Sequence, residues 1–313
     1  MIDRAAIAAA RRPLATQPDF LRTTPLMRLS GQSLGVECGE VWLKLEHLQV
    51  GGSFKARGML YRLLANPVPD SGVIIASGGN AGIAVAAAAR ALGVRCEVFV
   101  PEVSPEAKRA RLRALGAEVV VTGAAYSEAL EACVARQQAT GALQAHAYDQ
   151  PEVVAGAGTL ALEIEEQGGR PPDSVLVSVG GGGLIGGVAA WFASRAHVVA
   201  LEPERAPTLH AARAAGHPVD VEVGGVAADS LGARRIGALC WEISQRHVHD
   251  ALLLPDEAIR AAQLWLWKEF KLAVEPAAAL GLAALQTGAY KPQPQETVAL
   301  ILCGANFDPA SLA

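Results

Sequence analysis

From residue 72 onward, short apolar segments alternate with segments of helical pattern, and this alternation constrains the fold more than any other feature of the chain. Strands that alternate with helices in this way form mostly parallel sheets, and helices cover both faces. The alternation pauses near Asp149 and resumes after Pro151, which indicates two sheets. We therefore predict an α/β fold with two lobes, each a largely parallel sheet covered by helices. Ligands of such folds bind at the carboxyl ends of the strands, so the functional residues are expected there.

The element boundaries follow from the hydrophobic pattern and from glycine and proline stops. Residues 1–30 predict a helix and then an irregular arm, in which Pro25 imposes extended geometry. Ser104 and Pro105 predict the start of a helix, and residues 205–290 predict mostly helix. Strands are predicted at residues 41–45, 73–76, 97–100, 119–121, 144–148, 174–179, 197–201 and 297–302, and further helices at 80–92, 127–140, 154–167 and from Leu184.

Composition and charge exclude several classes of protein. The 313 residues carry a net charge of −4, which gives no reason to expect a nucleic acid or an anionic membrane as a partner. The N-terminus lacks the apolar core of a signal peptide, and no apolar run reaches the roughly 18 residues of a membrane span. The five cysteines are scattered without a C-x-x-C spacing, which is typical of reduced thiols. We therefore predict a cytoplasmic protein that binds neither nucleic acid nor membrane.

One lysine stands in an unusual context. The run of residues 51–58, Gly-Gly-Ser-Phe-Lys-Ala-Arg-Gly, places Lys55 between a glycine turn and a short helical segment. A lysine amine becomes a nucleophile when burial lowers its pKa, and enzymes use such amines to form a Schiff base with an aldehyde cofactor. Taken by itself, Lys55 fits a surface position or a phosphate contact better than a catalytic role.

Two glycine-rich loops stand at predicted strand–helix junctions, where backbone N–H groups and the helix dipole can bind an anion. The first, residues 77–82 (Ser-Gly-Gly-Asn-Ala-Gly), suits a carboxylate, and Asn80 is able to contact a cofactor hydroxyl as well. The second, residues 180–183, consists of four glycines and opens the helix that begins at Leu184. Four glycines let the backbone wrap around a phosphate.

The second loop also admits a nicotinamide dinucleotide site. Gly181, Gly183 and Gly186 satisfy G-x-G-x-x-G, and Glu202 ends the next strand about where a ribose-binding acid would stand. That interpretation leaves Lys55 and the first loop without roles, and four consecutive glycines differ from the spaced glycines of the motif. We therefore favour a phosphate site without a dinucleotide.

In combination and in this order, the motifs resemble those of the serine/threonine dehydratases. Residues 46–49 (Glu-His-Leu-Gln) and 52–58 are similar to the lysine motif of that family, and residues 180–183 are similar to its tetraglycine loop. Residues 24–26, 148–151, 156–159 and the end of the last strand extend the resemblance over nearly the whole chain. The family consists of pyridoxal-phosphate (PLP) enzymes with the tryptophan-synthase-β-like fold, fold type II. Its motifs are closest here to those of the serine dehydratases.

The resemblance implies a role for each motif. Lys55 holds PLP and removes the α-proton of the substrate, Asn80 binds the ring oxygen, and the four glycines bind the phosphate. The cofactor-binding residues implied are Phe54, Lys55, Asn80, Gly180, Gly181, Gly182, Gly183, Leu184 and Cys303. The residues implied for the substrate carboxylate are Ser77, Gly78, Asn80 and Ala81.

Cys303 would by itself be read as a buried thiol. In the family, a Ser or Cys at this position faces the pyridine nitrogen of PLP. A neutral thiol is a weak hydrogen-bond partner and does not hold that nitrogen protonated, so the ring is a moderate electron sink. This suits β-elimination and disfavours a long-lived carbanion.

The sequence departs from the family pattern at two places. The common Ser-Ser-Gly-Asn-His is Ser-Gly-Gly-Asn-Ala here, and Gly78 replaces the serine that serves as a second acid–base group in relatives that racemise serine. The family's divalent-cation triad aligns with Glu202 and Ala206, but its third, acidic position is Thr208. A monovalent cation held partly by backbone carbonyls is an alternative to a divalent ion. Glu275-Pro276 predicts a helix start and resembles a segment that lines the cofactor side.

We therefore expect a PLP-dependent ammonia-lyase that converts L-serine, L-threonine or a similar β-hydroxy amino acid to a 2-oxo acid and ammonia. A β-replacement synthase of the same family and a nicotinamide-dependent oxidoreductase are the alternatives. A large domain is predicted over residues 1–45 and 149–313, and a small domain over 46–148. The resemblance further implies a homodimer and a role in amino-acid catabolism. The chain stops at residue 313, which leaves nothing for the C-terminal regulatory domain of the biosynthetic threonine dehydratases, so control by isoleucine is not expected.

Overall fold

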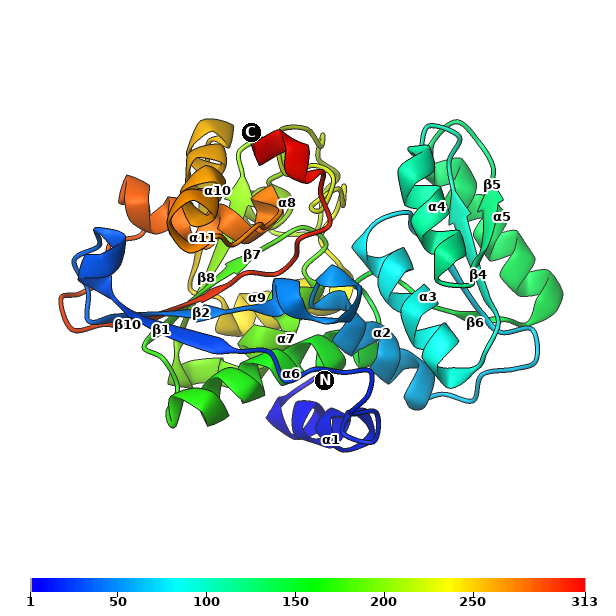
Figure 1. Cartoon of the computed structure of the whole chain (residues 1–313), viewed down its shortest axis with the longest axis horizontal. Coiled ribbons are helices and arrows are strands. Elements are labelled where there is room, and N and C mark those ends of the chain that lie inside the picture. Colours follow the sequence, from blue (N-terminus) through cyan, green and yellow to red (C-terminus); the bar gives the residue numbers. More distant parts are fainter. Residues whose placement is uncertain (1, 313) are drawn as a thin grey trace.

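The computed structural model describes residues 2–312 and has two lobes, each built on one sheet (Figure 1). The six-stranded sheet of the larger lobe has the order β1-β2-β10-β7-β8-β9, and the four-stranded sheet of the smaller lobe has the order β5-β4-β3-β6. Neighbouring strands are parallel in both sheets, except that β1 pairs antiparallel with β2. The predicted two-lobed α/β fold is confirmed.

The strands of the larger sheet are β1 (Leu26–Ser30), β2 (Glu40–Lys44), β7 (Ser174–Ser178), β8 (His197–Pro203), β9 (Asp250–Leu254) and β10 (Thr297–Ile301). Those of the smaller sheet are β3 (Val73–Ala76), β4 (Cys96–Val100), β5 (Glu118–Val121) and β6 (Leu143–Gln144). Side chains of β3, β4, β7 and β10 are buried along their whole length, as expected for central strands with helices on both faces.

The helices are α1 (Arg4–Leu14), α2 (Lys55–Leu64), α3 (Asn80–Leu92), α4 (Glu106–Ala114), α5 (Tyr126–Thr140), α6 (Pro151–Gly168), α7 (Gly183–Phe192), α8 (Thr208–Ala215), α9 (Ala238–His247), α10 (Asp256–Phe270) and α11 (Pro276–Thr287). Figure 1 shows α10 and α11 on one side of the larger sheet and α6 and α7 on the other. Among residues 2–312, we find no helix with the length and apolarity needed to cross a bilayer.

Four local predictions need correction. Two edge strands, β1 and β9, were not predicted, because their side chains are only partly buried and their apolar pattern is correspondingly weak. The strand predicted at 144–148 is limited to Leu143–Gln144, because the N–H of His146 already donates to the side chain of Gln150. Helix α4 begins at Glu106, since Pro105 keeps an extended ψ of 141°.

The two lobes meet where α2 packs against α6 at very short range. A Cβ at Gly58 would lie 2.5 Å from the carbonyl oxygen of Val153, and one at Gly156 would lie 2.7 Å from that of Arg57. Only glycine permits such an approach, so these two residues bring the N-terminal part of α2, and with it Lys55, against the larger lobe. The domain boundaries at 45/46 and 148/149 stay a prediction.

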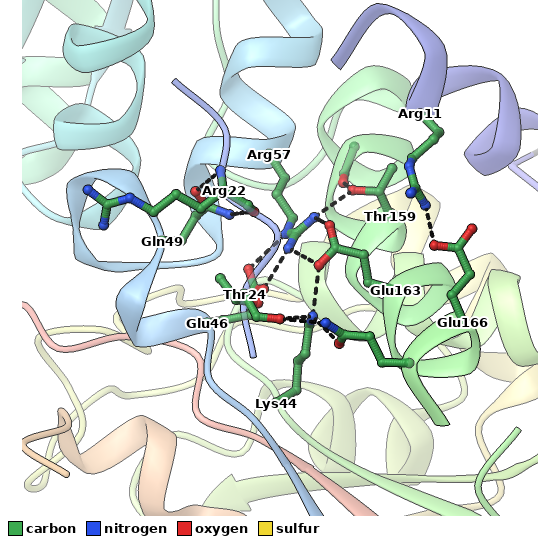
Figure 2. Close-up of polar contacts among 12 residues, drawn as sticks. Arg11, Arg22, Thr24, Lys44, Glu46, Gln49, Arg57, Thr159, Glu163 and Glu166 are labelled. Carbon is green, nitrogen blue, oxygen red and sulfur yellow. Dashed lines mark hydrogen bonds and ion pairs between the residues drawn. The ribbon is translucent and has the colours of Figure 1, made fainter. Parts of the chain in front are cut away.

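A buried cluster of four charged side chains fixes α2 in this place (Figure 2). We call it the ion-pair cluster, and it consists of Lys44, Glu46, Arg57 and Glu163. None of the four is more than 5% exposed. Arg57 donates to Glu46 at 2.7 and 2.8 Å and to Glu163 at 2.7 and 2.8 Å, and Lys44 donates to Glu163 at 2.7 Å. Two positive and two negative charges balance, so burial leaves no uncompensated charge.

Candidate active site

One cavity at the carboxyl ends of β7 and β10 contains all the residues predicted to bind a cofactor. Helices α2, α3, α7 and α11 begin at this cavity, so their N-terminal ends converge on it. Its lining residues are Phe54, Lys55, Asn80, Tyr148, Ser178, Gly180, Gly181, Gly182, Gly183, Leu184, Ser230, Leu231, Glu275, Ala277 and Cys303. Residues that are up to about 250 positions apart in the chain thus meet in one place, as expected at the strand ends of an α/β fold.

Lys55 is the first residue of α2, and its amine end is enclosed by protein although part of the side chain is exposed. The Nζ atom donates to the carbonyl oxygen of Ala147 at 2.5 Å and lies 5.1 Å from the ring centre of Phe54. Within residues 2–312, no carboxylate forms an ion pair with it. Burial lowers the pKa of Lys55 to about 8. A fraction of this amine is therefore neutral, and hence nucleophilic, near neutral pH.

The four glycines form a turn between β7 and α7. Gly182 has a φ of 93°, a left-handed conformation that favours glycine. Among the described residues, the N–H groups of Gly180, Gly181 and Gly182 have no hydrogen-bond acceptor, and they stand at the N-terminus of α7. Free N–H donors at a helix N-terminus are a binding site for a phosphate or another anion.

Cys303 is the second residue after β10 and is held against the lysine loop. The N–H of Phe54 donates to the carbonyl oxygen of Cys303 at 3.0 Å, and Ser53 forms a bridge with Gly304. The thiol is 3% exposed, and burial raises its pKa well above the ordinary value. The thiol therefore stays protonated and neutral beside Lys55. All five cysteines are free, as predicted.

A comparison with known families shows which family the chain belongs to. The family described as "Pyridoxal-phosphate dependent enzyme" matches residues 18–304, which is most of the chain. The chain belongs to this family of PLP-dependent enzymes. The nicotinamide interpretation of the glycine loop is thereby set aside.

Individual relatives of known identity agree with the family. An L-threonine ammonia-lyase of Thermotoga maritima is 35% identical over 277 residues, which are 86% of this chain and 68% of that protein. A phenylserine dehydratase of Ralstonia pickettii is 34% identical over 316 residues, covering 99% of this chain and 95% of that protein. Among solved structures, the T.th. threonine deaminase has a TM-score of 0.89 at 36% identity, covering 98% of this chain and 99% of that one. Maize serine racemase has a TM-score of 0.91 at 28% identity, covering 99% and 95%. The fold is that of the type II PLP enzymes.

The residues of the cavity fit PLP. A buried amine that forms no ion pair with a described residue matches an aldehyde. Free N–H donors at a helix end match a phosphate, and a neutral thiol matches a pyridine nitrogen. The free volume is about 40 Å³. The ring of Tyr148 packs against the glycine turn, since a Cβ at Gly181 would lie 2.3 Å from it.

The loop predicted to bind a carboxylate lies between this cavity and a larger cleft. The cleft has a volume of about 610 Å³ and is lined by Gly78, Gly79 and Asn80 together with residues of α4 and of the segment 306–308. Asn80 lines both spaces. In the described part of the chain, Ser77 and Ala81 line neither, and Ala81 packs in the core of the smaller lobe. Only the backbone N–H of Ala81 is therefore available to a substrate, as part of the N-terminus of α3.

The residues aligned with a cation site are also close together. Glu202 is the penultimate residue of β8. Its carboxylate accepts hydrogen bonds from the N–H groups of Leu209 and His210 at 2.7 and 2.8 Å and from Oγ1 of Thr208 at 2.9 Å. Glu202 thus caps the N-terminus of α8. Residues 2–312 contain no cluster of three or more His, Cys, Asp or Glu side chains suited to a metal ion. Cation binding by Glu202 and Ala206 stays a prediction.

Several lining residues were not among the predicted site residues. They are Tyr148, Ser178, Ser230, Leu231, Glu275 and Ala277. Tyr148 and Glu275 belong to segments that resemble the family, so a signal for them was present. The other four come from a strand end, an irregular segment and the first turn of α11, and nothing in their local sequence marks them.

Proposed function

We propose that the protein is a PLP-dependent ammonia-lyase, which dehydrates L-serine, L-threonine or a similar β-hydroxy amino acid. The observation that carries the proposal is the meeting of Lys55, the glycine turn and a neutral Cys303 in one cavity. The names of the relatives, ammonia-lyase and dehydratase, support the same reaction. When bound, PLP supplies an electron sink beside the α-carbon of the substrate.

Lys55 is the residue we assign to the α-proton. Its amine end lies inside the cavity, and burial, which lowers its pKa to about 8, makes it able to accept a proton near neutral pH. The α-proton and the β-hydroxyl group leave the substrate as one molecule of water. The enamine that remains exchanges its nitrogen for the oxygen of a second water, which yields the 2-oxo acid and ammonia.

The thiol of Cys303 favours elimination over slower alternatives. It stays neutral, so it would give the pyridine nitrogen of bound PLP no charged partner, and the ring would be a moderate electron sink. The β-hydroxyl group departs promptly and takes the electrons with it, so the reaction does not need a strong electron sink. We assign the substrate carboxylate to the loop with Ser77, Gly78, Asn80 and Ala81 at the N-terminus of α3, whose N–H groups favour an anion.

A product assay tests this function. The purified protein, loaded with PLP, is given L-serine, L-threonine, phenylserine and hydroxyaspartate, and the 2-oxo acid and ammonia are measured in equal amounts for at least one of them. A second series contains an added thiol. Formation of a thioether amino acid without 2-oxo acid would make the protein a β-replacement synthase and contradict the proposal.

The reaction is expected to be stereospecific, because Gly78 has no side chain to act as an acid or base. Racemisation needs one acid–base group on each face of the cofactor, and Lys55 serves only its own face. We expect elimination from L-serine with negligible formation of D-serine, measured by chiral chromatography. D-serine appearing as fast as pyruvate would refute the expectation.

The variant Gly78→Ser extends the test of stereospecificity. A Cβ at Gly78 would lie 3.3 Å from Val100 and 3.6 Å from Ser104, so a serine fits there after a small shift. We expect this variant to gain D-serine formation above the wild-type level. Gly78→Ala, which adds the same Cβ without a hydroxyl group, is the matched control and gains none.

We retain three further predictions as part of this proposal: a homodimer, a cytoplasmic location with a role in amino-acid catabolism, and a bound cation at Glu202 and Ala206. Light scattering of the purified protein tests the first. Dependence of activity on added monovalent and divalent ions tests the third.

A further inference from the structure

Glu275 is a buried carboxylate beside the cofactor cavity, for which the proposed reaction has no role. It precedes α11, is 3% exposed, and forms no ion pair with any described residue. Its N–H donates to the carbonyl oxygen of Gly304, next to Cys303, and a Cβ at Gly304 would lie 2.4 Å from its Oε1 atom. A carboxylate in such a place is costly unless hydrogen bonds satisfy it.

Those hydrogen bonds come from two asparagines. Nδ2 of Asn80 lies 3.1 Å from both Oε1 and Oε2 of Glu275, and the backbone N–H of Asn306 donates to Oε2 at 3.3 Å. The side chain of Asn306 turns the other way: its Nδ2 donates to Oδ1 of Asn80 at 2.5 Å and to the carbonyl oxygen of Gly51 at 2.7 Å. The three side chains therefore form one chain of hydrogen bonds, which ends at Gly51.

Above a pH of about 7, the value to which burial raises the pKa of Glu275, both ends of this chain only accept hydrogen bonds, and this determines the orientation of each amide. The carbonyl of Gly51 requires the NH2 of Asn306, and that same NH2 requires the oxygen of Asn80. The NH2 of Asn80 is then directed at the ionised carboxylate of Glu275. One N–H of Asn80 is used there, and the second is left for the cavity that Asn80 also lines.

We propose that Glu275 is a positioning residue for the cofactor: with Asn306 it holds the amide of Asn80 so that a donor N–H faces the cofactor ring oxygen. The proposal rests on the role of Asn80 in the proposed function. A glutamine at this position has one acceptor and one donor group. Nδ2 of Asn80 lies 3.1 Å from both carboxylate oxygens, so the NH2 group that replaces one of them faces it, donor against donor, and the amide of Asn80 loses its fixed orientation.

The test measures cofactor binding in the absence of substrate. Wild type and Glu275→Gln are titrated with PLP at a pH above about 7, the value to which burial raises the pKa of Glu275. We expect the dissociation constant to rise on the order of tenfold, the effect of one lost hydrogen bond. The visible absorption band of the bound cofactor is expected to shift, since its ring oxygen loses a donor. A role limited to stability would leave this band unchanged.

Two further variants make the test specific. Glu97→Gln is the matched control: Glu97 is 5% exposed, pairs with Arg136 in the smaller lobe, and does not line the cofactor cavity. We expect it to change neither the dissociation constant nor the band. In the background of Asn80→Ala, Glu275→Gln is expected to have no further effect, because Glu275 acts through Asn80.

Three outcomes would overturn the inference: an unchanged band and affinity in Glu275→Gln, the same loss in Glu97→Gln, or an undiminished loss in the Asn80→Ala background. If Glu275→Gln does not fold, Asn306→Ala carries the test, since it removes the donor to Oδ1 of Asn80 and leaves the carboxylate in place. Failure of the proposed ammonia-lyase activity is distinguishable, because wild type would then bind PLP and form no 2-oxo acid.

Discussion

Replacing Lys55 with alanine is expected to abolish turnover while the protein stays folded. The substitution removes the base for the α-proton, and loss of such a group costs about 10²–10⁴-fold in rate by itself. It also removes the amine that anchors the cofactor, so the total loss is larger. Because part of the side chain is exposed and its amine pairs with no described carboxylate, its removal leaves no uncompensated charge in the core. Production of 2-oxo acid measures the loss of turnover, and thermal unfolding shows whether the variant stays folded.

The covalent role of Lys55 is checked separately from its role as a base. After incubation with PLP and borohydride, the intact mass of wild type is expected to increase by one reduced cofactor, and that of Lys55→Ala is expected to stay unchanged. Lys291→Ala, an exposed lysine before β10, is the control and behaves as wild type. Near-normal dehydration by Lys55→Ala, together with the mass increase, would show that another lysine serves the site.

Replacing Glu163 with alanine is expected to lower the free energy of unfolding by about 3–5 kcal/mol, the usual cost of removing one partner from a buried ion pair. Glu163 accepts from both Lys44 and Arg57, which are at most 1% exposed, so both keep a buried positive charge with too little compensation. Denaturant unfolding of the cofactor-free protein measures the effect, because bound PLP would add its own stabilisation.

Figure 2 also contains the matched control for this prediction. Glu166 lies on the same helix and pairs with Arg11 at 2.8 Å, but both side chains are exposed. We expect Glu166→Ala to change the free energy of unfolding by less than about 1 kcal/mol. The double variant Lys44→Met, Glu163→Leu removes one positive and one negative charge together and is expected to recover much of the loss. Equal effects of Glu163→Ala and Glu166→Ala would contradict the prediction.

The same carboxylate has a predictable pH dependence. Burial alone would raise the pKa of Glu163, but Arg57 and Lys44 lower it below the ordinary value. A group with a lowered pKa stabilises the folded state above its unfolded-state pKa, and the contribution is lost as the pH falls through the lowered value. The difference in stability between wild type and Glu163→Ala should therefore shrink in acid and stay constant around neutral pH.

Local sequence was sufficient to predict a helix, strand or turn wherever a backbone preference or a strong hydrophobic pattern determines that element. Helix α3 runs from Asn80 to Leu92 as predicted, because Gly93 takes the left-handed conformation that ends it. The glycine turn before α7 and Lys55 at the start of α2 were predicted for the same reason, since few sequences suit such junctions. Edge strands β1 and β9 escaped prediction, because a strand that is buried on one side only, and partly, leaves a weak pattern.

The α/β class, the order of the motifs and the family could all be predicted before folding was considered, because each depends on residues that are neighbours along the chain. The folded chain was needed to show that Glu275, Asn306 and Asn80 form one hydrogen-bonded chain. It was also needed to show that four buried charges, those of Lys44, Glu46, Arg57 and Glu163, balance one another. Asn80 and Glu275 are 195 positions apart, and Arg57 and Glu163 are 106 apart. The residues next to a charged or amide side chain in the sequence do not indicate which distant residue it will contact. Hydrogen bonds and desolvation depend on distances that only the folded chain sets.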